Sequence, residues 1–437
     1  SYGKKGDAVV QMNWKAIDAG LDAVHKVEVP ASWSNPAADP APKALKGPEA
    51  LVKQIRDVME PISRMDGDSL PVSAFEGNVN GEWEQGASAY EKRGTAVMVP
   101  EWNAEKCIQC NQCAFVCSHA TIRPFCLTAA EAEAAPASTK LADTKPKASE
   151  YKFTMAVSPL DCMGCGVCVG VCPVGALTMV GQEEEAAQQD VFDYCVAEVA
   201  PKADMQDNTV KGSQFKQPYL EFSGSCAGCA ETSYARLVTQ LFGDRMYVGN
   251  AAGCSSAISG GAPILPYCKD CQGHGPAWEH SLFEDNAEFA YGFFHAQDSI
   301  RKELLIRLEA IKAAGIAVEA VEAYENGWKK TETSRIVTDA LIAALEQAEQ
   351  TEDVKYVLEN KEYLAKKSVW AVGGDGWAYD IGYGGIDHVM AQNRDVNLMV
   401  LDTEVYSNTG GQSSKSTPTS ATAKFAASGK RVAKKDL

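Results

Sequence analysis

The chain has 437 residues, of which 45% are hydrophobic and 23% charged, the composition of a globular protein long enough for two or three domains. Its formal net charge of −17 argues against nucleic-acid binding, which needs a basic face, and no apolar run is long enough to span a membrane. Fifteen cysteines, grouped in short clusters, indicate an intracellular metal protein rather than a secreted disulfide scaffold.

Residues 1–80 contain no cysteine and are expected to connect domains without contributing chemistry. Val10, Trp14, Ile17 and Leu21 stand at helical spacing, and a second helix is predicted to begin near Pro48. The Pro/Ala-rich stretch between these helices is expected to be a linker. Because the sequence does not begin with Met and ends soon after a glycine-rich loop, we expect a piece of a longer protein, cut at both ends.

Residues 81–200 are expected to form a module around two cysteine runs, each C-x2-C-x2-C-x3-C. In such runs the first three thiolates hold one 4Fe–4S cubane and the fourth reaches the other cluster. The spacing predicts one cluster on Cys107, Cys110, Cys113 and Cys172, and a second on Cys162, Cys165, Cys168 and Cys117. An insert near 127–150, rich in Ala, Lys, Glu and Pro, is expected to be a surface excursion.

Two zinc knuckles are the alternative for these eight cysteines, although zinc sites seldom use such dense runs. The module resembles a bacterial two-cluster ferredoxin with an insert. One departure is visible, because Pro173 follows the second run but Ser118 follows the first. This difference affects the expected turn after Cys117 and leaves the ligand set unchanged.

Residues 201–437 change to an α/β pattern. The segment 298–315 predicts an amphipathic helix with Leu304 and Leu308 on its apolar face, and 334–350 predicts another that Ser334 would cap. The apolar runs 368–374 and 396–404 are typical of buried parallel strands. Trp278 and Phe283 are expected in the core, and Cys126 and Cys195 are expected to be buried small residues.

The two predicted strands end in polar residues that suit a hard cation. Asp375 follows the first strand and Thr403 ends the second, so one βαβ crossover would bring both to the same edge of the sheet. The Asp375 carboxylate, the Thr403 hydroxyl and the Val405 carbonyl are oxygen ligands of the kind that Mg²⁺ prefers. The loop Asn408–Thr409–Gly410 could then approach a phosphate or a ring. An ordinary strand–turn–helix is the alternative.

This arrangement resembles the thiamine diphosphate motif, in which Gly-Asp-Gly precedes an Asn-containing segment. The segments "DTEVYSNTGGQSSKSTPTSATAKFAASGK" and "EWEQGASAYEKRGTAVMVPEWNAEKCIQC" are similar to those of pyruvate:ferredoxin (flavodoxin) oxidoreductases, of the 2-oxoacid:ferredoxin oxidoreductase family. The resemblance covers nearly the whole chain. It implies a connector (1–80), an α+β two-cluster ferredoxin-like domain (81–200) and an incomplete α/β thiamine-diphosphate-binding domain with a parallel sheet (201–437).

The resemblance also implies a third 4Fe–4S cluster, on Cys226, Cys229 and Cys254, whose fourth ligand lies outside this chain. Two alternatives involve the second C-x2-C pair, Cys268 and Cys271. These cysteines could complete a Cys₄ zinc site with Cys226 and Cys229, or could donate the missing cubane ligand. A redox disulfide between Cys226 and Cys229 is least favoured, because the pair lacks a thioredoxin-like setting.

The implied activity is oxidative decarboxylation of pyruvate with coenzyme A to acetyl-CoA and CO₂, with electrons passing through the clusters to ferredoxin or flavodoxin. Asp375, Gly376, Thr403, Val405, Asn408, Thr409 and Gly410 would bind Mg²⁺ and thiamine diphosphate, with Asn408 catalytic. The resemblance implies that the activating glutamate lies in absent domains, so this chain alone would be inactive. A homodimer in the cytoplasm, or in an anaerobic organelle, is expected. The alternative is a non-catalytic electron relay fused to an α/β partner with a structural zinc site.

Overall fold

The computed structural model describes residues 3–35, 44–145, 150–202, 208–261 and 264–437, which form two compact units, 1–47 and 48–437. The first unit contains the short turn η1 (Gly3–Lys5), the helix α1 (Asp7–Asp22) and the turn η2 (Ala31–Ser34). The predicted first helix is therefore confirmed. Part of the expected linker, residues 36–43, lies outside the described residues.

The second unit opens with a helical segment after Pro48, as predicted. It runs without a break through α2 (Glu49–Gln54), the π-helical η3 (Ile55–Met59) and α3 (Glu60–Ser63), and it buries Ile55, Val58 and Met59. Three short 3₁₀ turns follow: η4 (Gly67–Ser69), η5 (Val72–Asn78) and η6 (Ala87–Tyr90).

The cysteine module is α+β. Strands β1 (Met98–Trp102) and β5 (Leu177–Gly181) pair antiparallel, and β2 (Ile122–Leu127), β4 (Lys152–Val157) and β3 (Ala142–Asp143) form an antiparallel sheet in the order β2-β4-β3. The short helices α4 (Gln112–Val116) and α6 (Val167–Gly170) follow the two cysteine loops. Helix α7 (Gln188–Glu198) covers β4, and the turn η7 is Gln182–Glu185.

The insert carries α5 (Ala129–Ala134) and β3. Helix α5 begins in a capping box, in which the Thr128 hydroxyl accepts the Glu131 amide and the Glu131 carboxylate accepts the Thr128 amide. Residues 146–149 of the insert lie outside the described residues. The buried thiols Cys126 and Cys195 confirm the expectation that they are core residues.

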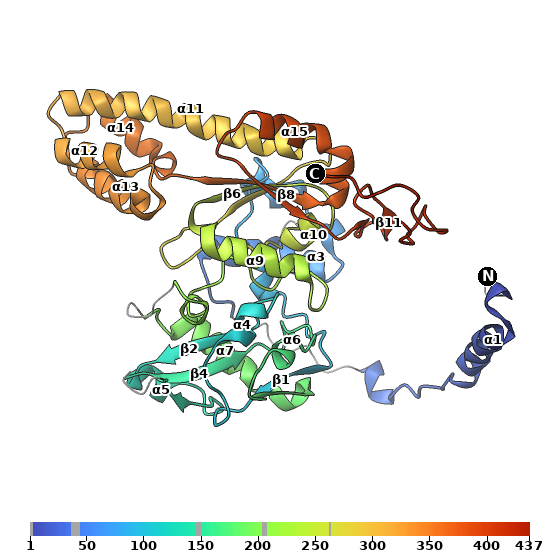
Figure 1. Cartoon of the computed structure of the whole chain (residues 1–437). Helices are drawn as coiled ribbons and strands as arrows, with labels where there is room; N and C mark the ends of the chain where they lie inside the picture. The colour runs from blue at the N-terminus through green and yellow to red at the C-terminus, as the bar shows by residue number, and fades with distance from the viewer. Residues whose placement is uncertain (1–2, 36–43, 146–149, 203–207, 262–263) are drawn as a thin grey trace. The chain divides into compact units, whose positions relative to one another are not determined.

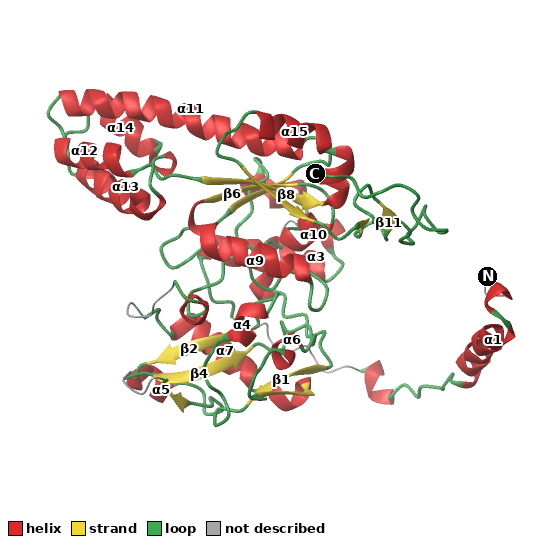
Figure 2. Cartoon of the chain, viewed as in Figure 1, coloured by secondary structure: helices red, strands yellow, loops and turns green. Residues whose placement is uncertain are grey.

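A four-stranded parallel sheet forms the core of the described α/β part (Figure 1, Figure 2). Its order is β7-β6-β8-β9, with β6 at Met246–Asn250, β7 at Ala277–His280, β8 at Ser368–Gly374 and β9 at Asn397–Leu401. Helices α11 (Asn286–Ala313) and α15 (Tyr383–Ala391) pack on one face around Ala371 and Trp377. Helix α9 (Ala230–Phe242) packs on the other face around Val248 and Val372. The predicted α/β fold with a parallel sheet is confirmed.

Four helices extend this part at one end of the sheet: α11 with α12 (Val318–Gly327), α13 (Thr331–Glu346) and α14 (Glu352–Glu359). Their shared core contains the predicted apolar face, including Leu304 and Leu308. The prediction that Ser334 caps α13 is wrong, because the helix begins at Thr331. Ser334 is buried in its first turn, where the hydroxyl accepts the Lys366 amide.

The remaining elements are short. They are α8 (Val210–Ser213), η8 (Gly243–Arg245), α10 (Cys254–Ser259), η9 (Lys361–Tyr363), the π-helical η10 (Gly376–Ile381), β10 (Val405–Tyr406) and β11 (Gln412–Ser413). Strands β10 and β11 pair antiparallel within the loop that follows β9. None of the described helices has the length and apolarity needed to cross a membrane.

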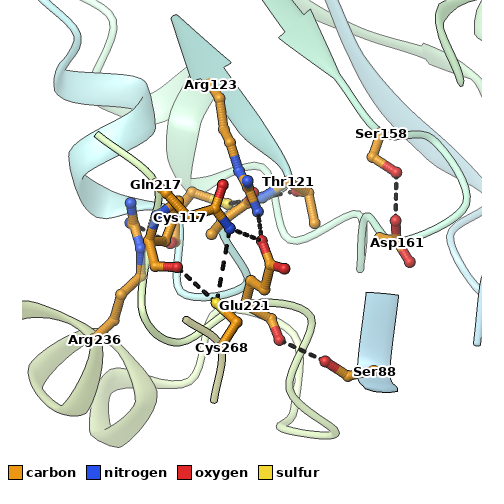
Figure 3. Close-up of polar contacts among 12 residues, drawn as sticks. Ser88, Cys117, Thr121, Arg123, Ser158, Asp161, Gln217, Glu221, Arg236 and Cys268 are labelled. Carbon is orange, nitrogen blue, oxygen red and sulfur yellow. Dashed lines mark hydrogen bonds and ion pairs between the residues drawn. The ribbon is translucent and has the colours of Figure 1, made fainter. Parts of the chain in front are cut away.

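A buried ion pair joins the cysteine module to the α/β part (Figure 3). Arg123 on β2 contacts Glu221, and both side chains are almost fully buried. The Arg123 guanidinium also donates to the Ala120 carbonyl and lies over the rings of Phe192 and Phe222. Gln217 donates to the same Glu221 carboxylate, and Ser88 donates to the Glu221 carbonyl. The pair therefore has additional partners at both ends.

We expect Arg123→Met and Glu221→Leu each to lower the free energy of unfolding by roughly 3–5 kcal/mol, because each leaves an uncompensated buried charge. The double variant should cost about 1–3 kcal/mol less than the sum of the two. Chemical denaturation of all four proteins measures this coupling. Lys53→Met, which breaks the exposed Lys53–Asp57 pair, is the control and should leave the unfolding midpoint unchanged. If the two single losses of unfolding free energy simply added up in the double variant, Arg123 and Glu221 would not act as a coupled ion pair.

Candidate active site and cluster ligands

Three predicted site residues follow three neighbouring strands of the parallel sheet. Cys254 comes four residues after β6, Asp375 directly after β8, and Thr403 two residues after β9. Because these strands are parallel and adjacent, their carboxyl ends lie at one edge of the sheet. Residues from all three loops line one cavity.

The three predicted Mg²⁺ ligands contact one another at this edge. The Thr403 hydroxyl lies 3.2 Å from Asp375 Oδ1 and 3.1 Å from the Val405 carbonyl. Asp375 is only 1% exposed, and its second oxygen, Oδ2, has no hydrogen-bond partner. Burial raises the pKa of this carboxyl. A buried carboxylate oxygen without a partner is costly, so the donor set fits a bound cation that would neutralise it.

Gly376 gives this edge its shape. A Cβ at position 376 would collide with the ring of Tyr406, so only glycine allows the loop after β8 to pack against β10.

The predicted loop residues differ in their positions. Asn408 and Thr409 line the cavity, whereas Gly410 does not and instead turns the chain with φ of 111° beside Lys424. Phe283, expected in the core, packs on the core and also lines the cavity. The expectation for Phe283 was therefore incomplete.

Glu231, in the first turn of α9, lines the same cavity and was missed from the sequence. Its Oε2 is buried without a hydrogen-bond partner. Burial, together with the nearby Asp375 carboxylate, raises the pKa of Glu231 to about 7. Its position two residues after Cys229, next to a predicted cluster ligand, is the sequence signal that could have found it. The cavity holds about 30 Å³, which is too small to enclose a molecule of cofactor size.

The structure brings together the cysteines predicted for each ferredoxin-type cluster. Burial, and then the charges of Cys107, Cys110 and Cys172, raise the pKa of Cys113 to about 12. Burial, and then Cys117 and Cys165, raise the pKa of Cys162 to about 11. Burial, and then chiefly Cys117 and Cys162, raise the pKa of Cys168. In both sets the fourth cysteine of one run therefore lies beside the first three of the other, the crossed pairing that two cubanes require.

Cys254 lies near Cys226 and Cys229, the remaining predicted cysteine ligands. Burial, and then Glu231, Cys229 and Cys226, raise the pKa of Cys254, while Asn408 donates to it.

Cys268, an alternative ligand, is directed elsewhere. Its buried thiol donates to the Pro218 carbonyl and contacts Gln217. Among the described residues no three Cys, His, Asp or Glu side chains converge on a single metal ion. The Cys₄ zinc arrangement with Cys268 and Cys271 is thus not formed there.

The Cys226–Cys229 loop packs directly on the second cysteine run. Gly228, with φ of 69°, lies so close that a Cβ there would be 3.4 Å from the Cys165 Cβ and 3.9 Å from its sulfur. A second link runs through the buried His119: its Nδ1 is 3.0 Å from the Ser118 hydroxyl and its Nε2 is 2.8 Å from the Ser225 hydroxyl. The residue after Cys117 is thus joined to the residue before Cys226.

Lys92 and Arg93, between η6 and β1, contact the same region. Lys92 pairs with the buried Asp161, the residue before Cys162, and Arg93 donates to the Phe222 carbonyl. A larger cavity of about 620 Å³ lies between β2, the end of α7, residues 214–219 and residues 269–272, and of the described residues the alternative ligand Cys271 is the one candidate that lines it. The oxygen donors predicted for the cation lie at the sheet edge and not in this larger cavity.

Comparison with protein-family models identifies three regions. Residues 41–96 match a domain of unknown function, residues 106–176 match a 4Fe-4S dicluster domain, and residues 355–436 match the C-terminal TPP binding domain of thiamine pyrophosphate enzymes. The second match contains both cysteine runs, and the third contains Asp375 and the loop after β9. The first includes Lys92 and Arg93.

Curated relatives align along the whole chain. It is 50% identical to the pyruvate:ferredoxin oxidoreductase of Moorella thermoacetica and 48% identical to the pyruvate-flavodoxin oxidoreductase of Klebsiella pneumoniae, and it spans 38% and 37% of their lengths. It is 41% identical to a pyruvate dehydrogenase [NADP(+)] of Cryptosporidium parvum, of which it spans 26%. With identity of this level over all its residues, and with the dicluster and thiamine diphosphate regions in the same chain, this protein belongs to the pyruvate:ferredoxin (flavodoxin) oxidoreductase family, of whose longer members it represents a part.

Proposed function

We propose that this chain is the electron-transfer and thiamine diphosphate part of a pyruvate:ferredoxin or pyruvate:flavodoxin oxidoreductase. The complete enzyme would oxidise pyruvate with coenzyme A to acetyl-CoA and CO₂ and would reduce ferredoxin or flavodoxin. It would be a cytoplasmic homodimer that carries three 4Fe–4S clusters, thiamine diphosphate and Mg²⁺. The division into a connector (1–80), a dicluster domain (81–200) and a thiamine domain (201–437) belongs to the same proposal.

This proposal is carried by one observation: a predicted cluster ligand and the predicted cofactor ligands line the same cavity. Cys254 lines the same cavity as Asp375, Thr403 and Asn408, and Asn408 donates to its thiol. Residues suited to a diphosphate and its cation thus touch a cysteine that lies beside Cys226 and Cys229. An electron relay fused to an unrelated α/β domain would have no reason to place these groups together.

The roles of the residues follow from their positions. Asp375, Thr403 and the Val405 carbonyl would hold Mg²⁺, and Gly376 and Thr409 would approach the diphosphate. Thiamine diphosphate supplies the electron sink for decarboxylation when bound. Glu231 from helix α9 and Asn408 from the loop after β10 line the cavity and would position the reacting groups, while Phe283 and Tyr406 would form an aromatic side that excludes water.

The cysteines would provide the exit for electrons. Because Gly228 packs against Cys165, the loop of Cys226 and Cys229 adjoins the cluster set that contains Cys117. The set of Cys107, Cys110, Cys113 and Cys172 is then the remaining one, and its loop exposes Ile108 to a partner. The 4Fe–4S clusters, when bound, carry single electrons along this order.

We expect Asp375→Ala to abolish retention of thiamine diphosphate and Mg²⁺ in the full-length enzyme, because the substitution removes the buried carboxylate of the cation site. Cofactor content after gel filtration measures this. Asp387→Ala, on the exposed side of α15, is the matched control and should retain both cofactors. If Asp375→Ala kept wild-type cofactor content, the relay function would be favoured instead.

The chain by itself, purified anaerobically, should contain about eight irons, equal sulfide and no zinc, because two complete cubanes and one incomplete ligand set are present. Metal analysis, with EPR of the reduced sample, tests this. About twelve irons would show that Cys268 or Cys271 moves to complete the third set. Zinc beside eight irons would contradict the proposal and favour a structural site. Pyruvate-dependent dye reduction should be absent.

A further inference from the structure

Arg236 reaches from the middle of α9 to the end of α4, the short helix that carries Cys113 and ends just before Cys117 (Figure 3). Its Nη1 lies 2.7 Å from the Ala114 carbonyl, 3.2 Å from that of Phe115 and 2.7 Å from that of Cys117. Its Nη2 donates to Gln214 Oε1 at 3.1 Å, and its Nε has no hydrogen-bond partner. Arg236 is only 7% exposed.

This guanidinium carries a positive charge without a carboxylate within ion-pair distance in the described parts of the chain. A buried charge without a counter-charge is costly, and backbone carbonyls supply only partial charges. The largest favourable charge on the guanidinium comes from Cys117, whose carbonyl Nη1 contacts, and a smaller one from Glu221, which the nearby Arg123 opposes. A cubane on four thiolates is an anion, so the cluster that Cys117 helps to hold would supply the missing negative charge.

A second buried arginine shows what a purely structural role looks like. Arg301 on α11 also donates to two carbonyls, those of Tyr363 and Ala365. Its guanidinium, however, lies 4.9 Å from the ring centre of Trp328, and Asp298 lies close enough to favour its charge. Arg301 therefore has an aromatic ring and a carboxylate beside it that belong to no cluster, whereas the largest favourable charge on Arg236 comes from a predicted cluster ligand.

We propose that Arg236 sets the reduction potential of the cluster held by Cys117, Cys162, Cys165 and Cys168. This inference depends on the proposed function, since it needs that cluster to be present. When the cluster takes one electron from the reduced neighbouring cluster, which is thereby oxidised, its negative charge rises by one and no bond changes. A fixed positive charge beside Cys117 stabilises that more negative state, so the potential is higher than it would be without Arg236.

The test is a redox titration of the full-length, anaerobically purified enzyme, followed by EPR of the reduced clusters. Arg236→Gln keeps an amide donor for the carbonyls but removes the charge. We expect the reduced-to-oxidised ratio of this cluster at a fixed potential to fall about tenfold, which for one electron is a shift of about 59 mV to lower potential. Arg236→Lys keeps the charge and should stay near the wild-type potential.

Gln214→Glu provides a second route if Arg236→Gln does not assemble its clusters. It places a carboxylate 3.1 Å from Nη2, neutralises the guanidinium in place and should lower the potential in the same direction. Arg301→Gln is the matched control: it removes a buried arginine far along α11 and should lower stability without moving any potential.

Iron content distinguishes a failure of the proposed function from a failure of the role proposed for Arg236. A wild-type enzyme without 4Fe–4S signals would sink the proposed function itself. Full iron content with a wild-type potential in both Arg236→Gln and Gln214→Glu would overturn only the role of Arg236. Equal shifts in Arg236→Lys and Arg236→Gln would overturn it as well, because a lost hydrogen-bond pattern, and not a lost charge, would then explain the effect.

Discussion

The contact between helix α9 and the end of helix α4 is the constraint on which the rest of the molecule depends. Helix α9 begins directly after Cys229, places Glu231 in its first turn toward the cavity, and directs Arg236 at the carbonyls of α4. A helix is rigid over this length, so the three positions are fixed relative to one another. One element therefore sets the spacing between the cofactor cavity, the Cys226 loop and the Cys117 cluster set.

The parallel sheet supplies the other half of this arrangement. Its β6, β8 and β9 end at one edge, and each is followed within four residues by a group with chemistry: Cys254, Asp375 and Thr403. Ligands of open α/β folds bind at this edge of the sheet, outside the carboxyl ends of the strands. The loop after β9 then folds back through β10 and β11, so that Asn408 returns to Cys254.

The sequence alone predicted those parts that depend on local spacing. The cysteine runs specified two cluster sets because the interval between thiolates is itself the signal, and the Asp375–Thr403 interval specified a βαβ crossover. Glu231 carried only the weak signal of its position beside Cys229, and Arg236 carried none, since their contacts with Asp375 and with helix α4 join residues more than a hundred positions apart. Ser334 was misassigned because its hydroxyl accepts the Lys366 amide, 32 positions away, and tertiary packing places it inside the helix.

The surroundings of Ser118 show that the cysteine module packs closely on the α/β part of the chain. A free ferredoxin can use proline after its fourth cysteine to shape a local turn. Here the residues after Cys117 are buried against the α/β part, with Ser118 on His119 and His119 on Ser225, beside Cys226. The contact between the two cysteine loops therefore constrains which residues can stand at positions 118 and 119. A relay that worked independently of the cofactor cavity would leave this surface exposed and its sequence free to follow the ferredoxin pattern.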